Sequence, residues 1–500
     1  MDTEIVEATE AAEVIGISET VGVVETNGIA EAVEAAVNGI SQTSTVIGVI
    51  GMLAAIAVMV IGAYRGMKPI TLTLLAAFVV IITNGMNIWH AFARVPAIGD
   101  VLSGGGYAFG FGNAMNRFFF IFVASSIYAV IMDRTGCTGS IGTQMVKWFG
   151  TKHVMAVVYF FTVILTFGGV SLFVVFFAAL PIAYVMFREA NLPRALIMAP
   201  MGAGGAGITM TTLPGTPSLT NVIPGQALGT PLTAAPVFSL ILAAIIVAIT
   251  LVYFKMAEKS VRSKNMAFTF PVGFDASALT GEKAKLPHPV LAFIPIIFLP
   301  LFIILSSVLK APYAQDGMQL TVFAMVLGTV LCLILNFKKV SRAGLKQWTT
   351  DGATNGLMAI TALAAVLAFG SVVSSAPAFR SVIGWVMGLD LSVYWKGLVS
   401  TGIISGIVGS SSGGAQIVLD NLTPLFLAAG EAGANLQVLH RIIAMAAGTF
   451  DTLPHVSAIF VFLGVLGCTH KEAYKYLFWT TVVIPTVITT FAVIAATIIW

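Results

Sequence analysis

The chain interrupts its own long apolar segments with polar stretches rich in glycine or proline, and it does so twice in the same order. The first pair of interruptions lies at residues 166–171 and 211–218, and the second pair lies at residues 409–414 and 451–458. A helix that breaks at membrane depth leaves backbone groups without hydrogen-bond partners, unless the break is enclosed by protein or lines a water-filled cavity. Four breaks therefore require a fold that encloses a polar interior.

The composition predicts an integral membrane protein. Hydrophobic residues make up 58% of the chain and charged residues 9%, with a mean hydropathy of +0.96, whereas soluble domains carry roughly 25% charged residues. Apolar stretches of the length that crosses a bilayer recur along the chain. We expect an all-α polytopic membrane protein with about 12–14 membrane segments, some of them re-entrant or broken helices. Nucleic acid is not an expected partner.

The distribution of charge predicts two halves of opposite orientation. Residues 1–45 hold nine of the 22 acidic residues and no lysine or arginine, so we expect an acidic extracytoplasmic tail. Repeats at 46–254 and 289–500 are joined by a basic cytoplasmic linker at 255–288. With the N-terminus outside, 19 of the 25 basic residues fall on the cytoplasmic side, as the positive-inside rule demands. The second repeat then starts on the opposite side from the first, so the repeats are inverted.

The breaks have the chemistry of an anion site. Glycine lets the backbone approach a ligand closely, and a helix that begins after a break directs its free N–H groups and positive dipole end at the cavity. Serine and threonine add hydroxyl groups that donate or accept hydrogen bonds. The alternative is that the glycines serve close helix packing alone. The predicted substrate-binding residues are Gly168, Gly169, Ser171, Thr211, Thr212, Gly215, Thr216, Ser410, Ser411, Ser412, Gly413, Gly414 and Thr452.

A few ionisable residues fall within the apolar second half. Such residues are costly at membrane depth and indicate function by default, although a helix cap or an interhelical hydrogen bond would also explain them. His440 and Arg441 are expected nearer a membrane interface. The three cysteines are isolated in the sequence and predict small packing residues, with neither a metal site nor a disulfide. The candidates for carrying a coupled proton are Asp451, His455 and Asp420.

These motifs resemble the gluconate permease family of proton symporters, within the wider ion transporter superfamily. The resemblance covers about residues 46–500, and it implies an inner-membrane carrier of bacteria that takes up a small hydroxylated organic anion with protons. The chain has Phe167-Gly168-Gly169-Val170 where gluconate carriers have Tyr-Glu-Val-Gly, so it looks more like the branches that carry 3-hydroxybutyrate and similar hydroxy-carboxylates. The matching stretches are Gly168-Gly169-Val170-Ser171-Leu172-Phe173, Leu213-Pro214-Gly215-Thr216-Pro217, Asn221-Val222-Ile223-Pro224, Gly409-Ser410-Ser411-Ser412-Gly413-Gly414 and Asp451-Thr452-Leu453-Pro454-His455.

The prediction is thus a secondary transporter with alternating access and no cofactor, for which a homodimer is one possible assembly. Coupling to Na⁺ instead of protons is the alternative, because unwound carbonyls and hydroxyls also suit that ion. An anion channel is a second alternative, but it would need a continuous pore. An intramembrane enzyme would need a nucleophile with a partnered base, which the sequence does not offer, and no GxxxxGK[ST] motif indicates ATP coupling.

Overall fold

The computed structural model describes residues 26–93, 105–167, 172–216, 218–269, 286–309 and 317–500. Within these ranges the chain is all-α and contains no strand. Long apolar helices and one sharply bent helix pair confirm the predicted class of polytopic membrane protein. Most of the acidic tail and the first break at 168–171 lie outside the described residues.

The first half contains straight helices followed by short and broken ones. Three of its helices are long: α2, α5 and α11. The last of these continues to Ser263, so the first part of the basic linker is helical. The elements are α2 (Thr26–Tyr64), α3 (Pro69–Thr83), α4 (Ile88–Ala93), α5 (Tyr107–Arg134), α6 (Cys137–Phe149), α7 (Val154–Phe167), α8 (Leu172–Glu189), η2 (Arg194–Ile197), α9 (Met198–Gly202), the π-helix η3 (Ala203–Thr209), α10 (Leu219–Leu228) and α11 (Pro236–Ser263).

The second half repeats this order. A long helix, α15, is followed by a short one and then by helices that end at the two later breaks. Its elements are α13 (Pro289–Val308), α14 (Gly317–Leu335), η5 (Phe337–Lys339), α15 (Arg342–Ser375), α16 (Pro377–Met387), α17 (Val393–Val408), α18 (Ser411–Glu431), α19 (Leu436–Thr449), α20 (Ser457–Leu466), the π-helix η6 (His470–Tyr474), α21 (Lys475–Leu477), the π-helix η7 (Phe478–Val483) and α22 (Ile484–Ile499).

Proline and glycine set many of the helix ends. Pro236 and Pro377 stand in the first turn of their helices, where the missing N–H costs nothing because no carbonyl precedes it in the helix. Gly409 and Gly467 end α17 and α20 in the left-handed conformation, which a side chain would strain. The breaks in the sequence thus become breaks in the helices.

Helix packing follows the same pattern in both halves. Each half starts with a packed pair, α2 with α3 and α13 with α14, and each pair packs on the long helix of the other half, α3 on α15 and α14 on α5. Likewise α2 packs on α16 while α13 packs on α6, and α8 packs on α20 while α18 packs on α10. Exchanging the two halves therefore leaves these contacts unchanged. This exchange supports the predicted repeats, whose boundaries and inverted orientation stay predictions.

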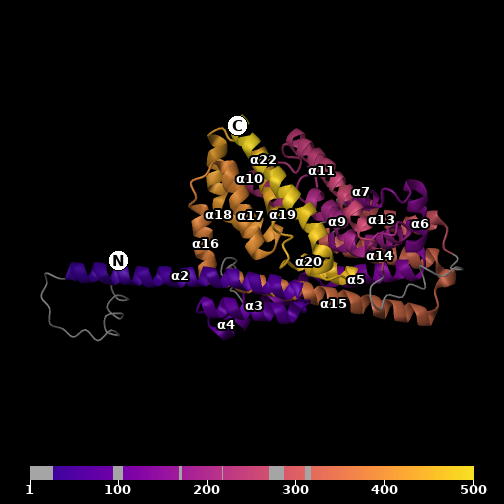
Figure 1. Ribbon diagram of the computed structural model, residues 1–500, viewed down its shortest axis with the longest axis horizontal. Helices are drawn as coiled ribbons and strands as arrows, with labels where there is room; N and C mark the ends of the chain where they lie inside the picture. Colours follow the sequence, from indigo (N-terminus) through magenta and orange to yellow (C-terminus); the bar gives the residue numbers. More distant parts are fainter. Residues whose placement is uncertain (1–25, 94–104, 168–171, 217, 270–285, 310–316) are drawn as a thin grey trace.

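The two long helices α5 and α15 lie side by side along the base of the molecule in Figure 1 and form the most extensive helix pair among the described residues. Glycines permit this close approach. A methyl group at Gly356 would lie 2.8 Å from the carbonyl oxygen of Phe122, and one at Gly352 would lie 2.6 Å from the Cα of Ile127. Small residues that bring backbones together are the usual device for helix association in membranes, where lipid offers no hydrophobic driving force.

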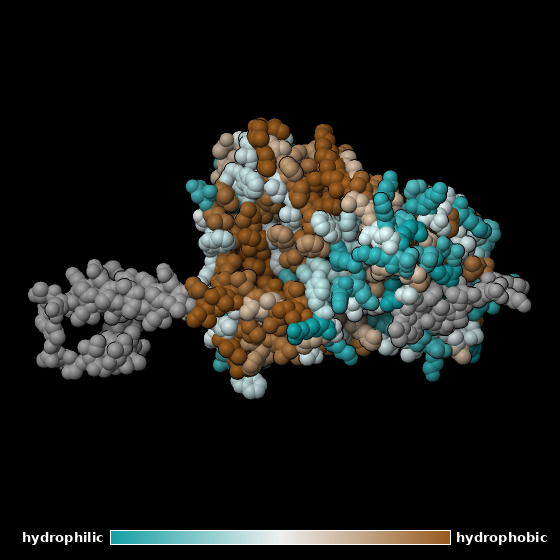
Figure 2. Space-filling view, viewed as in Figure 1, coloured by the Kyte–Doolittle hydropathy of each residue, from teal (hydrophilic) through white to brown (hydrophobic). Residues whose placement is uncertain are grey.

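The outer surface suits a bilayer. Five described helices are long and apolar enough to span a membrane, or six if the pair α6–α7, bent by 118°, is one span. Figure 2 shows hydrophobic residues over the end of the molecule that holds α2, α18 and α22, and hydrophilic residues gathered toward α6. Shorter apolar helices such as α17 and α20 complete the interior. The count of 12–14 segments stays a prediction.

The close packing of α5 on α15 predicts that larger side chains are not tolerated at its glycine contacts. We expect Gly356→Val to destabilise the protein by about 1–3 kcal/mol, the usual range for an overpacked interior. Gly384→Val in α16 is the matched control, because no atom lies within 4 Å of its Cβ position. Thermal unfolding of the detergent-solubilised variants, followed by intrinsic fluorescence, measures the difference. Equal melting temperatures for both variants would contradict the close packing of α5 on α15.

Candidate functional site

The break between α17 and α18 is a tight turn and not a long unwound stretch. Gly409 turns the chain, and Ser410 caps α18 by accepting a hydrogen bond from the N–H of Gly413 at 3.2 Å. The predicted site residues Ser411–Gly414 therefore form the first turn of α18. A methyl group at Gly414 would lie 2.4 Å from the Cα of Ser405, so this glycine holds the start of α18 against the end of α17.

The break between α19 and α20 contains Asp451 and His455 and lies beside that turn. The hydroxyl of Ser411 interacts with the Asp451 carboxyl group, while the Oδ1 atom of this carboxyl has no hydrogen-bond partner among the described residues. His455 is buried, and its Nε2 donates to the carbonyl oxygen of Gly406 at 2.9 Å. Both breaks of the second half thus meet at one place.

Three buried polar atoms around these breaks lack partners within the described chain. They are Oδ1 of Asp451, Nδ1 of His455 and Oγ of Ser405. Buried polar side-chain atoms in native proteins are nearly always hydrogen-bonded, so each exception needs an explanation such as a water, an ion or a ligand. Three such atoms on adjoining elements indicate a polar site that receives something from outside the chain.

The corresponding break of the first half satisfies its own polar groups. The hydroxyls of Thr211 and Thr212 lie 3.2 Å apart, and those of Thr216 and Ser218 also lie 3.2 Å apart. Ser218 donates to the carbonyl oxygen of Met210 at 3.0 Å. Gly215 follows Pro214 with a φ of 83°, which permits the turn. The hydroxyl groups of the stretch between η3 and α10 are therefore bonded to one another and to nearby backbone, and their role in binding stays a prediction.

The second breaks of the two halves converge on α19 and the π-helix η7. Thr211 packs on Gly448 of α19, where a methyl group would lie 2.2 Å from the threonine Cγ2. Thr452 bonds the hydroxyl of Thr481 in η7 at 2.8 Å. π-helical turns occur frequently at functional sites, and both η3 and η7 pack here. The predicted residues Gly168, Gly169 and Ser171 lie outside the described residues.

Asp420, the third predicted coupling residue, lies apart from this centre. Its carboxylate is exposed and accepts a hydrogen bond from Gln416 one turn earlier on α18 at 2.6 Å. Both residues line a cavity of about 480 Å³ between α10 and α18. A role for Asp420 in coupling stays a prediction.

Arg441 and His440 are more central than the sequence suggested, since both side chains are fully buried within the protein. The Arg441 guanidinium donates to the carbonyl oxygens of Thr211, Leu232 and Ala234 at 3.3–3.4 Å. His440 bonds Asn221 at 2.8 Å on the other side of the same loop. The two residues fasten the first-half break to α19 of the second half.

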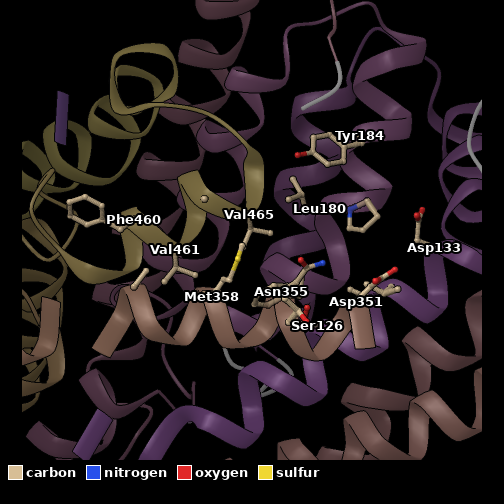
Figure 3. A pocket seen from close by; sticks show the side chains of 18 of the residues that line it. Ser126, Asp133, Leu180, Tyr184, Asp351, Asn355, Met358, Phe460, Val461 and Val465 are labelled. Atoms are coloured by element: carbon tan, nitrogen blue, oxygen red, sulfur yellow. The ribbon is translucent and has the colours of Figure 1, made fainter. Parts of the chain in front are cut away.

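A larger cavity of about 680 Å³ lies between α5, α15, α8 and α20 (Figure 3). One wall is polar and comes from the long helices, with Ser126, Asp133, Asp351 and Asn355. The opposite wall comes from α8 and α20 and is mostly apolar, with side chains such as Leu180 and Val461 in Figure 3. The volume lies within the range of small-molecule sites, roughly 300–1,000 Å³.

The two cavities occupy equivalent positions of the two halves. Each α18 residue that lines the smaller cavity comes 239 positions after an α8 residue that lines the larger cavity (416 − 177). Likewise, each α10 residue that lines the smaller cavity comes 238 positions before an α20 residue that lines the larger cavity (461 − 223). The equivalent pairs are Phe177 and Gln416, Leu180 and Leu419, Pro181 and Asp420, Tyr184 and Thr423, Val461 and Ile223, Gly464 and Gln226, and Val465 and Ala227.

The chain is similar over most of its length to a transporter. It is 28% identical over 477 residues to the uncharacterized transporter YxjC of Bacillus subtilis (strain 168), covering 89% of this chain and 97% of that protein. No family model matches the chain. A solved structure of Neisseria gonorrhoeae MtrF, from a class of antimetabolite efflux pumps, aligns with 87% of this chain and 95% of its own at 12% identity and a TM-score of 0.33. That likeness is too weak to support an argument.

The contacts of Arg441 predict a large loss of stability on truncation. Arg441→Ala would leave the buried carbonyl oxygen of Thr211 without its donor, at about 1–3 kcal/mol for a group left unsatisfied. The carbonyl oxygens of Leu232 and Ala234 would each keep another donor. Arg380→Ala on the exposed surface of α16 is the control. We expect a clearly lower melting temperature for Arg441→Ala alone, measured on purified protein in detergent. A melting temperature equal to that of the control would contradict the fastening role.

Proposed function

We propose that this protein is a secondary transporter that imports a small hydroxylated organic anion by proton symport. The observation that carries the proposal is the repeated pair of helix breaks, whose second-half members bring three unpartnered polar atoms together. Broken helices at equivalent places of two repeats are typical of the binding sites of secondary transporters. The similarity to the transporter YxjC over 89% of the chain supports transport as the activity.

The character of the site favours an anion that also carries hydroxyl groups. Ser410–Gly414 place the N-terminus of α18 at the site, and such an end favours negative charge. Hydroxyls of Ser405 and Ser411 can bond the cargo's own hydroxyls. No lysine or arginine lies in any of the four breaks, and the two terminal nitrogens of the Arg441 guanidinium already donate to carbonyl groups. Amides and hydroxyls hold an anion without locking it, as a carrier requires.

Asp451 is the proposed proton carrier. Its carboxyl group is the acidic group that faces the start of α18, through Ser411. An ionised carboxylate there would repel an anionic cargo, whereas a protonated one would donate a hydrogen bond to it. Binding of the cargo and of the proton would therefore favour each other, which is the requirement for symport. His455, with its free Nδ1, would take part in the same exchange.

The two equivalent cavities are the proposed access routes. If the repeats are inverted, equivalent positions face opposite sides of the membrane. In this structure α8 packs on α5 and α20 packs on α15, whereas their counterparts α18 and α10 do not pack along the long helices among the described residues. Exchanging these two arrangements would open one cavity and close the other around a fixed site.

Uptake into proteoliposomes tests the function. With an inward proton gradient, we expect accumulation of a labelled hydroxy acid from the set 3-hydroxybutyrate, lactate, gluconate and citrate. Asp451→Asn should abolish gradient-driven uptake, because a neutral amide cannot exchange a proton, while Asp390→Asn at an exposed loop should leave it intact. Uptake driven by a sodium gradient alone would identify Na⁺, and not the proton, as the coupling ion. Absence of gradient-driven uptake of all four acids would refute the proposed substrate class.

Side-specific labelling tests the access routes. In a chain whose cysteines are replaced by serine, Gly464→Cys and Gln226→Cys place thiols at equivalent positions of the two cavities. A membrane-impermeant thiol reagent should reach Gln226→Cys from the extracytoplasmic side and Gly464→Cys from the cytoplasmic side. Added substrate should change the two labelling rates in opposite directions. Labelling of both positions from the same side would exclude inverted repeats.

A further inference from the structure

Two of the three cysteines, which the sequence presents as isolated packing residues, face each other across the two halves. The Sγ atoms of Cys137 and Cys332 lie 3.9 Å apart, although 195 residues separate them along the chain. Cys137 is the first residue of α6, and Cys332 lies in the last turn of α14. Both side chains are buried. Cys468 lies elsewhere, beside Arg194.

Polar groups surround this thiol pair. The side-chain amide of Asn336 donates toward Sγ of Cys137 at 3.3 Å, and the hydroxyl of Thr135 lies 3.6 Å from Sγ of Cys332. The ammonium group of Lys339 donates to the carbonyl oxygen of Thr135 at 3.0 Å. Cysteines that serve only as packing residues normally sit among apolar side chains. Hydrogen-bond donors and a nearby cation instead favour the thiolate, which is the reactive form.

The pair lies at a joint of the fold. Gly136 has a φ of 80° and separates α5 from α6, while Gly150 has a φ of 72° and separates α6 from the region of α7. Helix α6 therefore links the long helix α5 to the broken segment α7–α8 through two glycine turns. It packs on both α8 and α13. A movement of α8 against α5 that carries α6 with it would bend the chain at the turn of Gly136.

We propose that Cys137 and Cys332 form a reversible disulfide when a peroxide is present, and that this bond stops transport by tying α6 to α14. The proposal rests in its second part on the proposed transport function. A bond between the sulfurs, about 2.05 Å long, needs only a short approach from their present separation. It would fix the first residue of α6 beside the hinge at Gly136 and so prevent the rearrangement of α8 against the long helices.

The chemistry needs one two-electron oxidant. The thiolate of one cysteine attacks hydrogen peroxide, and the O–O bond breaks to give a sulfenic acid and, with a proton, water. The second cysteine loses its proton and attacks the sulfenic sulfur, forms the S–S bond and displaces hydroxide, which takes up that proton and leaves as a second water molecule. Two thiols and one peroxide thus give one disulfide and two waters. A dithiol reductant reverses the reaction by thiol–disulfide exchange.

Mass spectrometry of the intact, full-length protein in proteoliposomes tests bond formation without reference to transport. After treatment with dilute hydrogen peroxide and alkylation of remaining thiols, we expect a cross-linked peptide that contains Cys137 and Cys332. Dithiothreitol should remove it. Cys137→Ser and Cys332→Ser should each abolish it, whereas Cys468→Ser should not. Further oxidation of either thiol without a cross-link would overturn the proposed bond.

Transport by the same samples tests the consequence. Peroxide should reduce uptake several-fold in the unmodified protein and in Cys468→Ser, with recovery after dithiothreitol, and should leave Cys137→Ser unaffected. A complete cross-link with unchanged uptake would overturn the regulatory part of the proposal. If no substrate is transported even before oxidation, the proposed function fails instead, and the cross-linked peptide still decides whether the bond forms.

Discussion

The need to satisfy backbone hydrogen bonds away from water governs this structure. Each of the described breaks sits inside the protein and finds substitutes for the lost helical bonds: Ser410 caps α18, and Arg441 supplies donors to three carbonyl groups of the first half. A lipid-facing break would be prohibitively costly, so the breaks themselves are enclosed by neighbouring helices. The polar interior is thus a consequence of the breaks.

Close packing between helices holds these breaks in position. Gly352 and Gly356 allow the long helices to pack with their backbones in contact, and Gly414 seats the start of α18 on Ser405. A site made of backbone amides and hydroxyls depends on such precision, since these groups act only over hydrogen-bond distances. Of these glycines, Gly414 is the one that the sequence predicts to let the backbone approach a ligand, and it has a packing role as well. For Gly414 the packing role is visible directly, and the two roles do not conflict.

The sequence predicts local features well and long-range contacts poorly. Helix ends and breaks were foreseeable, because proline and glycine change backbone preferences at their own positions, and the stretch from Asp451 to His455 indeed separates two helices. The contact of Arg441 with Thr211 was not foreseeable, since it joins residues 230 apart, and neither was the approach of Cys137 to Cys332. Such contacts depend on how helices pack, and no local pattern encodes that.

The two halves keep one architecture but differ in chemistry. Thr211 and Gly215 stand where the second half has Asp451 and His455, each 240 residues later (451 − 211). The hydroxyl groups of the neutral break bond one another, whereas the ionisable break leaves polar side-chain atoms unpartnered among the described residues. In the breaks that the structure describes, the ionisable residues belong to the second half alone. If Asp451 carries the coupled proton, as proposed above, a single proton bound in one half would bias a rearrangement in which both halves take part.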